Sequence, residues 1–188
     1  MSKNPIIVAP MSRKQIEDYA LAVRRALGVE DARAVKMLRL LELVLPSVFS
    51  DYRFEVVPDR ELGDAEATTS MTEQCIKISE RCYEAARAGH ARYPFTLAHE
   101  LGHLLLHTGK AAQLARGIRV KPYMNAEWQA DAFASAFLMP AHEVERCTSI
   151  SDIMRRFGVS RSAAEVRTSV LKLALPFLPR SISIGGPR

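Results

Sequence analysis

The chain has 188 residues, a formal net charge of +5 and an apolar content of 48%, which is ordinary for a globular protein. No apolar run approaches the roughly 20 residues that span a membrane, and the short, proline-broken apolar stretch near the N-terminus does not resemble a signal peptide. The three cysteines are odd in number and lack the spacing of metal ligands, so we expect a cytoplasmic protein with reduced thiols.

The first part of the chain predicts two helices followed by a small sheet. Ser12 and Gln15 form a capping-box pattern at the start of a helix that ends before Gly28. A second helix is expected over residues 30–45, ending at Pro46. Three short β-prone runs separated by turn residues then predict a small antiparallel sheet. These runs cover residues 52–57, 67–71 and 75–79.

A short helix near residues 80–88 leads to the sequence His-Glu-Leu-Gly-His at positions 99–103. Residues four apart share one face of a helix, so His99 and His103 can present two imidazoles to a single metal ion. Glu100 lies beside them, where it can reach a water on the metal without being a ligand. A tetrahedral catalytic zinc needs a third protein ligand and an open fourth position. The motif therefore predicts a zinc site that still lacks one ligand.

Histidines further along the same helix do not supply that ligand. His107 lies two turns beyond His99, about 12 Å along the axis, which is too far for one ion with bonds of about 2 Å. The metzincin pattern needs a histidine at position 109, where this chain has Gly109. We therefore expect an acidic ligand from another helix and interpret His107 as a helix-end residue favoured by the macrodipole.

The second metal helix is predicted from Asn125 to Leu138, a stretch of good helix formers. Glu127 and Asp131 share one face of this largely apolar helix. Such a pair is most often a solvated face, but two carboxylates in an apolar setting require a partner. We predict that Glu127 is the third metal ligand and that Asp131 accepts the spare ring N–H of His99 or His103. Zinc is the expected ion, and manganese is conceivable.

Two stretches of the sequence resemble the ImmA/IrrE family of metallopeptidases. One is residues 93–107, and the other is residues 127–140, where Phe137-Leu-Met-Pro replaces the family's usual Leu-Leu-Met-Pro. The resemblance covers about residues 12–175, and the catalytic positions of the family map onto His99, Glu100, His103 and Glu127. It implies a zinc endopeptidase that cleaves a protein partner. That partner would be a DNA-binding helix-turn-helix repressor, whose cleavage switches on stress, phage or mobile-element genes.

Residues 108–124 connect the two metal helices and contain four basic residues and no acid. This segment either lines the substrate cleft or is an ordinary solvated loop. The basic residues are Lys110, Arg116, Arg119 and Lys121.

The C-terminal region, residues 141–188, holds 8 basic and 4 acidic residues. Ser149–Phe157 and Arg161–Leu173 predict two helices around a tight turn, as in a helix-turn-helix. The second helix offers few side chains for reading bases, which favours a structural or protein-docking role over direct DNA binding. Those side chains are Arg161, Ser162, Glu165 and Arg167. The final residues, 179–188, are predicted to be disordered.

These features predict an α+β fold. Residues 1–140 would form a mainly helical, zincin-like metallopeptidase core with a small antiparallel sheet, and residues 141–188 a helix-turn-helix-like extension. Glu100 would act as the general base in peptide hydrolysis. Tyr93, Tyr123 or His107 could stabilise the oxyanion, and the sequence selects none of them. The alternative function is a non-catalytic transcriptional regulator, or a toxin–antitoxin component, with a structural metal site.

Overall fold

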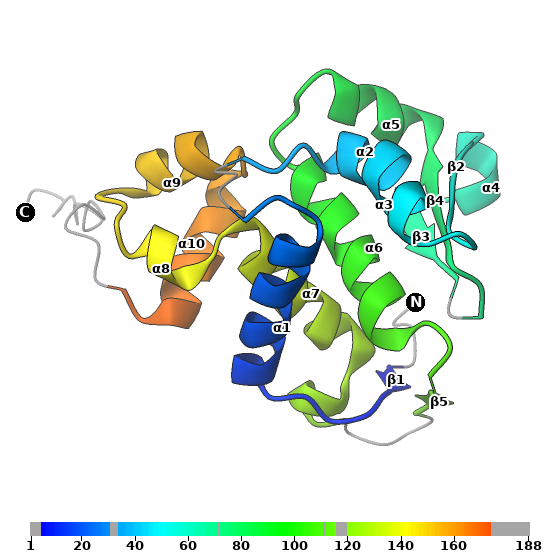
Figure 1. Ribbon diagram of the computed structural model, residues 1–188, viewed down its shortest axis with the longest axis horizontal. Helices are drawn as coiled ribbons and strands as arrows, with labels where there is room; N and C mark the ends of the chain where they lie inside the picture. The colour runs from blue at the N-terminus through cyan, green and yellow to red at the C-terminus, as the bar shows by residue number, and fades with distance from the viewer. Residues whose placement is uncertain (1–4, 31–33, 71, 111, 116–119, 174–188) are drawn as a thin grey trace, which may run out of the picture.

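The computed structural model describes residues 5–30, 34–70, 72–110, 112–115 and 120–173. Two long helices, α6 (Tyr93–His107) and α7 (Ala126–Leu138), pack against each other at its centre, and α1 (Arg13–Ala26) packs on α7 (Figure 1). The sheet and α5 lie on one side of this helical centre, and α8, α9 and α10 lie on the other. The fold is therefore α+β and mainly helical, as the sequence predicts.

Helix α1 begins as predicted, with the Ser12 side chain and the Gln15 side chain forming a reciprocal capping box. Gly28, just after this helix, has a φ of 65°, a left-handed conformation that glycine adopts without a steric penalty. The next helical segment differs from the prediction of a helix over residues 30–45. It consists of α2 (Met37–Arg39), a π-helical turn η1 (Leu40–Val44) and α3 (Leu45–Val48).

This segment continues past Pro46, where the sequence predicts its end. The N–H of Leu45 bonds to the carbonyl of Leu40, five residues back, and Pro46 then lies in the first turn of α3. A proline in a first helical turn loses no intrahelical hydrogen bond, because that N–H has no partner there. The π-turn thus shifts the backbone hydrogen bonding by one residue, which places Pro46 where its missing N–H is tolerated.

The three-stranded sheet is mixed rather than wholly antiparallel. Its strands are β2 (Arg53–Val57), β3 (Ala67–Thr69) and β4 (Cys75–Ser79), in the order β2-β4-β3. The β3–β4 pair is antiparallel as predicted, but β2 and β4 are parallel. The chain crosses from β2 through α4 (Asp59–Leu62) to the far edge, so that β4 enters between the other strands in the direction of β2.

A second small sheet lies within the segment that the sequence leaves irregular. Strand β1 (Ile6–Ile7) pairs antiparallel with β5 (Gln113–Leu114), and the short 3-10 helix η2 (Pro122–Met124) precedes α7. The N-terminal segment of the chain is therefore held against the connection between α6 and α7.

Helix α5 (Glu80–Arg87) begins at its N-cap Ser79 and leads into α6, as predicted. The C-terminal region contains α8 (Ala141–Val144), α9 (Ile150–Phe157) and α10 (Arg161–Leu171). Gly158, with a φ of 65°, ends α9, and the Ser160 side chain caps α10. The predicted helix–turn–helix shape is confirmed for the described residues, whereas the segment predicted to be disordered lies outside them.

Arg167 on α10 is not available to contact DNA bases, although the sequence places it among the candidate residues for base recognition. Its side chain is fully buried, and its Nε donates a hydrogen bond of 2.8 Å to the carbonyl oxygen of Met139. The rest of its guanidinium forms two hydrogen bonds with the carboxylate of Glu17 on α1. A buried charge needs such a set of partners. Arg167 therefore fixes α10 to α1 and to the end of α7.

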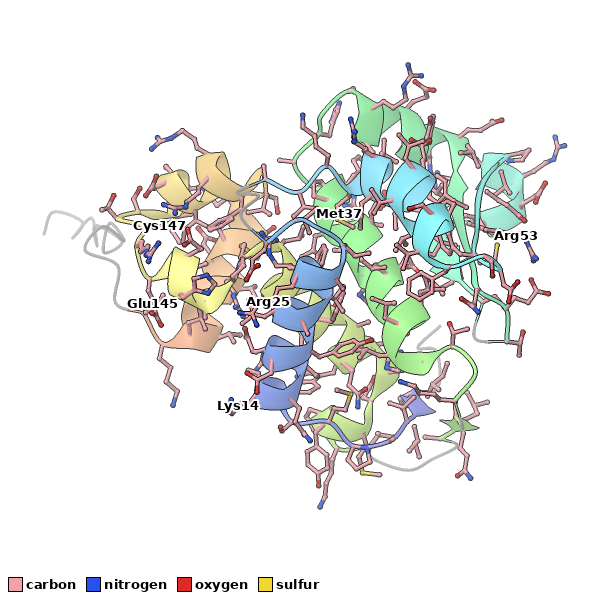
Figure 2. The ribbon with its side chains drawn as sticks, in the orientation of Figure 1. Lys14, Arg25, Met37, Arg53, Glu145 and Cys147 are labelled. Atoms are coloured by element: carbon pink, nitrogen blue, oxygen red, sulfur yellow. The ribbon has the colours of Figure 1, made fainter. Side chains whose placement is uncertain are left out.

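Most charged side chains lie at the surface, with Arg24, Glu100 and Arg167 as buried exceptions, and the apolar side chains form one core cluster. In Figure 2 the labelled Lys14 and Arg53 extend outward on different sides of the molecule, whereas Met37, which is 3% exposed, lies near α6. Cys75, Cys82 and Cys147 are buried free thiols. None of the helices in the described ranges is both long and apolar enough to cross a membrane.

Replacing Glu17 with glutamine tests the role of the Arg167 contact. The change removes the negative charge but keeps the side-chain shape, which leaves a buried guanidinium without its counter-charge. We expect the free energy of unfolding, measured by urea denaturation, to fall by about 3 kcal/mol. A matched Glu165→Gln variant, altered at an exposed position on α10, should unfold like the wild type. Equal stability of all three proteins would contradict this role for the pair.

Candidate metal centre

The close approach of α6 and α7 depends on Gly102, the fourth residue of the His-Glu-Leu-Gly-His motif. A Cβ at this position would lie 3.1 Å from the Cα of Ala130 and 3.1 Å from a ring carbon of Phe133. These are closer than ordinary van der Waals contacts, and one of the two atoms belongs to the backbone of α7. Glycine at position 102 therefore lets the two helices approach closely enough for side chains on both to share one site.

Three predicted ligands converge at this contact. His99 and His103 extend from α6 with their Nε2 atoms 3.0 Å apart. Glu127, in the first turn of α7, places one carboxylate oxygen 3.3 Å from His99 Nε2 and the other 3.5 Å from His103 Nε2. The Asn125 side chain caps α7 and holds this turn by accepting from the N–H of Glu127. The histidines are largely buried, whereas the carboxylate is more exposed.

Asp131 lies one turn further along α7 and contacts His99, not His103. Its Oδ1 is 2.8 Å from His99 Nδ1. A carboxylate only accepts hydrogen bonds, so His99 Nδ1 carries the proton and, in the neutral ring, Nε2 keeps a free lone pair. The carboxylate thus fixes both the orientation and the tautomer of this imidazole.

His107 is the last residue of α6, as predicted, but it is buried within the site and is not partly protonated. It is 1% exposed, its Nδ1 lies 3.1 Å from His103 Nδ1, and its Nε2 lies 3.1 Å from Gln129 Oε1. Burial lowers the pKa of His107 to about 4, so the ring is neutral. The helix macrodipole does not protonate the ring, because the ring lies in the α6–α7 interface, where losing water disfavours the charged form.

The amide of Gln129 determines the direction of this hydrogen-bond chain. Its Nε2 donates to the carbonyl oxygens of Ala9 and Tyr123, each at 2.8 Å, so Oε1 must face His107. His107 Nε2 then carries the proton and donates to Oε1, which leaves Nδ1 of the neutral ring as an acceptor. His103 must therefore donate from Nδ1, and its Nε2 keeps a free lone pair. We call these residues, Gln129, His107 and His103, the histidine relay.

Glu100 lies on the same turn as His99 but is not part of the three-atom cluster. It is 8% exposed, and its Oε2 accepts a hydrogen bond of 2.7 Å from the hydroxyl of Thr69 on β3. The Thr69 hydroxyl is also 3.0 Å from the backbone carbonyl oxygen of Glu100. The edge strand of the sheet thus holds one carboxylate oxygen of Glu100 and leaves the other for a reacting group.

The donor set fits a small divalent cation. A tetrahedral zinc with bonds of about 2.0–2.1 Å separates its ligand atoms by about 3.3 Å, close to the 3.0, 3.3 and 3.5 Å observed. Two lone pairs and a carboxylate facing one another repel unless positive charge lies among them. Burial lowers the pKa of His99, but hydrogen bonds with Asp131 and Glu127 outweigh this and raise it to about 10. Surroundings that favour a proton so strongly would also favour a metal cation in its place.

Hydrogen bonds with His103 and His99 also hold the pKa of Glu127 well below its usual range. The carboxylate is therefore ionised at neutral pH, as a metal ligand must be.

Other candidates from the sequence are less closely connected to the cluster. Tyr93 begins α6, and Tyr123 is exposed with the ammonium of Lys121 5.8 Å from its ring centre. Lys110 is exposed, and Arg116 and Arg119 lie outside the described residues. The idea that this basic segment lines the substrate cleft stays a prediction, as does any oxyanion-stabilising role.

Replacing Gly102 with alanine tests the helix approach. Alanine is the better helix former by about 1 kcal/mol, but overpacking against Ala130 costs about 1–3 kcal/mol. We expect a net loss of stability and weaker zinc binding, measured by thermal unfolding and by competition with a chromophoric chelator. The matched variant is Gly109→Ala, at an exposed position just after α6 where the added methyl meets nothing within 4 Å, although the φ of 69° should make alanine less stable there. The zinc affinity of Gly109→Ala should be unchanged. A Gly102→Ala protein with higher stability and unchanged zinc affinity would contradict this role for Gly102.

Comparisons with known proteins support a family assignment. The model of the peptidase M78 family, described as the IrrE N-terminal-like domain, matches residues 71–169. Among solved structures, a Mycobacterium tuberculosis transcriptional regulator matches with a TM-score of 0.55 and 22% identity over 86% of this chain. The chain covers 48% of that regulator, about half its length, and the low identity supports the shared fold alone. No curated protein matches significantly. The family match confirms the resemblance noted in the sequence, and the chain belongs to the peptidase M78 family of metallopeptidases with an IrrE N-terminal-like domain.

Proposed function

We propose that this protein is a metal-dependent endopeptidase that cleaves a protein partner. His99, His103 and Glu127 would hold the metal, and Glu100 would act as the general base. The observation that carries the proposal is the arrangement of two imidazole lone pairs and one carboxylate around a common point, next to a further buried carboxylate. Zinc is the proposed ion because its usual ligands are nitrogen and oxygen atoms at tetrahedral spacing. Manganese is the alternative ion.

A bound divalent metal supplies Lewis-acid polarisation of the scissile carbonyl and lowers the pKa of water. Glu100 would accept a proton from the attacking water on the carboxylate oxygen that Thr69 does not bind. It would then pass that proton to the leaving amine nitrogen. Asp131 and the histidine relay engage Nδ1 of the two imidazoles, so that Nε2 of each ring would face the metal. Thr69 would hold the other carboxylate oxygen of Glu100 in place.

The donor set favours a catalytic site over a structural one. Structural zinc sites are closed by four protein ligands, whereas catalytic sites keep one position open. Within the described residues, His99, His103 and Glu127 are the potential ligands that form such a cluster. Glu100 has no evident purpose in a structural site, because burying a carboxylate is unfavourable. A non-catalytic regulator or toxin–antitoxin component with a structural metal is therefore the second candidate.

The proposed substrate is a DNA-binding repressor of the helix-turn-helix type. The family resemblance implies such a partner, and the structural neighbour is itself described as a transcriptional regulator. We further propose that residues 1–140 form the peptidase domain and that residues 141–188 form a helix-turn-helix-like extension. The buried Arg167 argues against base reading by α10, which favours a protein-docking role for this extension. Cytoplasmic cleavage of the repressor would switch on stress or mobile-element genes.

Replacing Glu100 with glutamine tests the catalytic role. Glutamine keeps the size of the side chain and its contact with Thr69 but cannot accept a proton as a base does. Zinc binding should be retained, and cleavage of a partner captured from the host lysate should fall by about 10² to 10⁴-fold. A matched Glu61→Gln variant, altered at a surface position, should cleave like the wild type. A fully active Glu100→Gln protein would contradict the mechanism.

Replacing Glu127 with alanine tests the ligand set. The loss of the one carboxylate that faces both Nε2 atoms should lower zinc occupancy after dialysis, as measured by elemental analysis. Glu145→Ala, at an exposed position beyond α8, serves as the control and should keep full occupancy. If Glu127→Ala retained zinc as tightly as the control, another residue would have to be the third ligand.

Replacing Gln129 with methionine tests the histidine relay. Methionine has a similar length but cannot accept a comparable hydrogen bond from His107 Nε2. The tautomer of His107, and through it that of His103, is then no longer fixed. Loss of an outer partner of this kind weakens metal affinity by about 10- to 100-fold. Zinc affinity should be measured on folded protein, with the exposed Gln113→Met as the control. Equal affinities in the two variants would show that the relay does not orient His103.

A further inference from the structure

A cavity of about 660 Å³ lies beside the metal cluster, between α6, α7 and α10. His99, a member of the cluster, and Asp131, which holds the His99 ring, also line this cavity. The cavity therefore reaches the edge of the proposed metal site at His99. Its size is within the range of about 300–1,000 Å³ typical of ligand-binding pockets.

The walls of the cavity are mainly apolar. Phe95 comes from α6, Trp128 and Ala132 from α7, and Val166 and Val170 from α10. Val166 is 60% exposed, so α10 presents a large apolar side chain to solvent at this wall. The exposed apolar surface of α10 lies in the same cavity as two aromatic side chains, Phe95 and Trp128. Such a combination is typical of a binding surface rather than of a solvated helix face.

A polar atom without a partner lies in the same wall. The Oγ atom of Ser135 on α7 is buried and has no hydrogen-bond partner among the described residues. The Ser135 residue is 6% exposed and lines the cavity. A buried hydroxyl without a hydrogen-bond partner is unfavourable, because it has lost its hydrogen bonds to water. A backbone N–H or carbonyl of a peptide whose apolar side chain enters the cavity could satisfy it.

Charges at the rim do not compete for this space. The guanidinium of Arg13 lies 5.0 Å from the ring centre of Trp128, and Arg92 forms a 2.8 Å ion pair with Glu66. Asp131 is engaged with His99. The interior is therefore left to apolar groups.

We propose that this cavity binds a bulky apolar side chain of the substrate, next to the bond that is cleaved, and that α10 forms one wall of the substrate cleft. This inference rests on the proposed function. It assigns the C-terminal helical unit a role in peptide selection rather than in base reading. The Arg167 contacts with Glu17 and Met139 keep that wall at a fixed distance from α7.

The test uses two zinc-binding probes, a leucyl hydroxamate and an alanyl hydroxamate that are otherwise identical. Their affinities for the zinc-loaded full chain are measured by calorimetry. Each buried methylene strengthens binding by about fourfold, so the leucyl probe should bind at least about tenfold more tightly. Trp128 is the one tryptophan of the chain and lines the cavity. Its fluorescence should therefore change with the leucyl probe more than with the alanyl probe.

Val166→Arg and Ser169→Arg form the matched pair of variants. Both add one positive charge to an exposed position of α10, but only position 166 lines the cavity. The leucyl preference should fall to less than about threefold in Val166→Arg, which loses one apolar wall, and should persist in Ser169→Arg. Because both positions are exposed, neither change should impair folding.

The outcomes separate this inference from the proposed function. Tight binding of both probes without a leucyl preference would overturn the apolar cavity and leave the metal site intact. A leucyl preference that Val166→Arg does not alter would place the side chain elsewhere and also overturn the inference. If neither probe bound the zinc-treated protein, the metal site itself would be wrong, and the inference would fail with it.

Discussion

The contact between α6 and α7 at Gly102 is the constraint on which the rest of the site depends. One helix carries two imidazoles and the other carries a carboxylate, and neither set can surround a cation alone. The missing Cβ at position 102 brings the backbone of Ala130 close to α6, which sets the distances among the three donor atoms. Because Glu127 lies in the first turn of α7, the capping of that turn by Asn125 also fixes where the carboxylate reaches α6.

Each imidazole is held from behind by a different part of the chain. Asp131 holds His99 directly, whereas His103 is held through His107 and Gln129, whose amide bonds to the backbone at Ala9 and Tyr123. The N-terminal segment and the connection between the two metal helices therefore both take part in orienting His103. The small β1–β5 pairing keeps these two segments together. The direction of the His103 lone pair that would face the metal thus depends on residues that are far from His103 in the sequence.

The sequence predicts the parts of the site that follow from helix periodicity. The four-residue spacing of His99 and His103 fixes their common face whatever surrounds them, and the same holds for Glu127 and Asp131. The choice between His99 and His103 as the partner of Asp131 depends on how the two helices cross, so only the structure could show it.

The role of Thr69 could not be predicted from the sequence, because a threonine in a short strand carries no pattern that indicates a contact with Glu100. His107 ends α6 as predicted, but its predicted protonation state was wrong because the burial of its ring depends on α7. The predicted role of Arg167 was wrong because its partner Glu17 is 150 positions away. The parallel β2–β4 pairing likewise depends on a crossover that local patterns do not reveal.

X-ray absorption at the zinc edge of the zinc-loaded full chain tests the central claim most directly. The account predicts two imidazole nitrogens at about 2.0–2.1 Å, with oxygen as the remaining type of ligand atom. In Glu127→Ala the imidazole signal should persist while the affinity falls. Zinc bound by sulfur, or by fewer than two imidazoles, would contradict the account. Such a result would mean that the convergence of His99, His103 and Glu127 does not form the metal site.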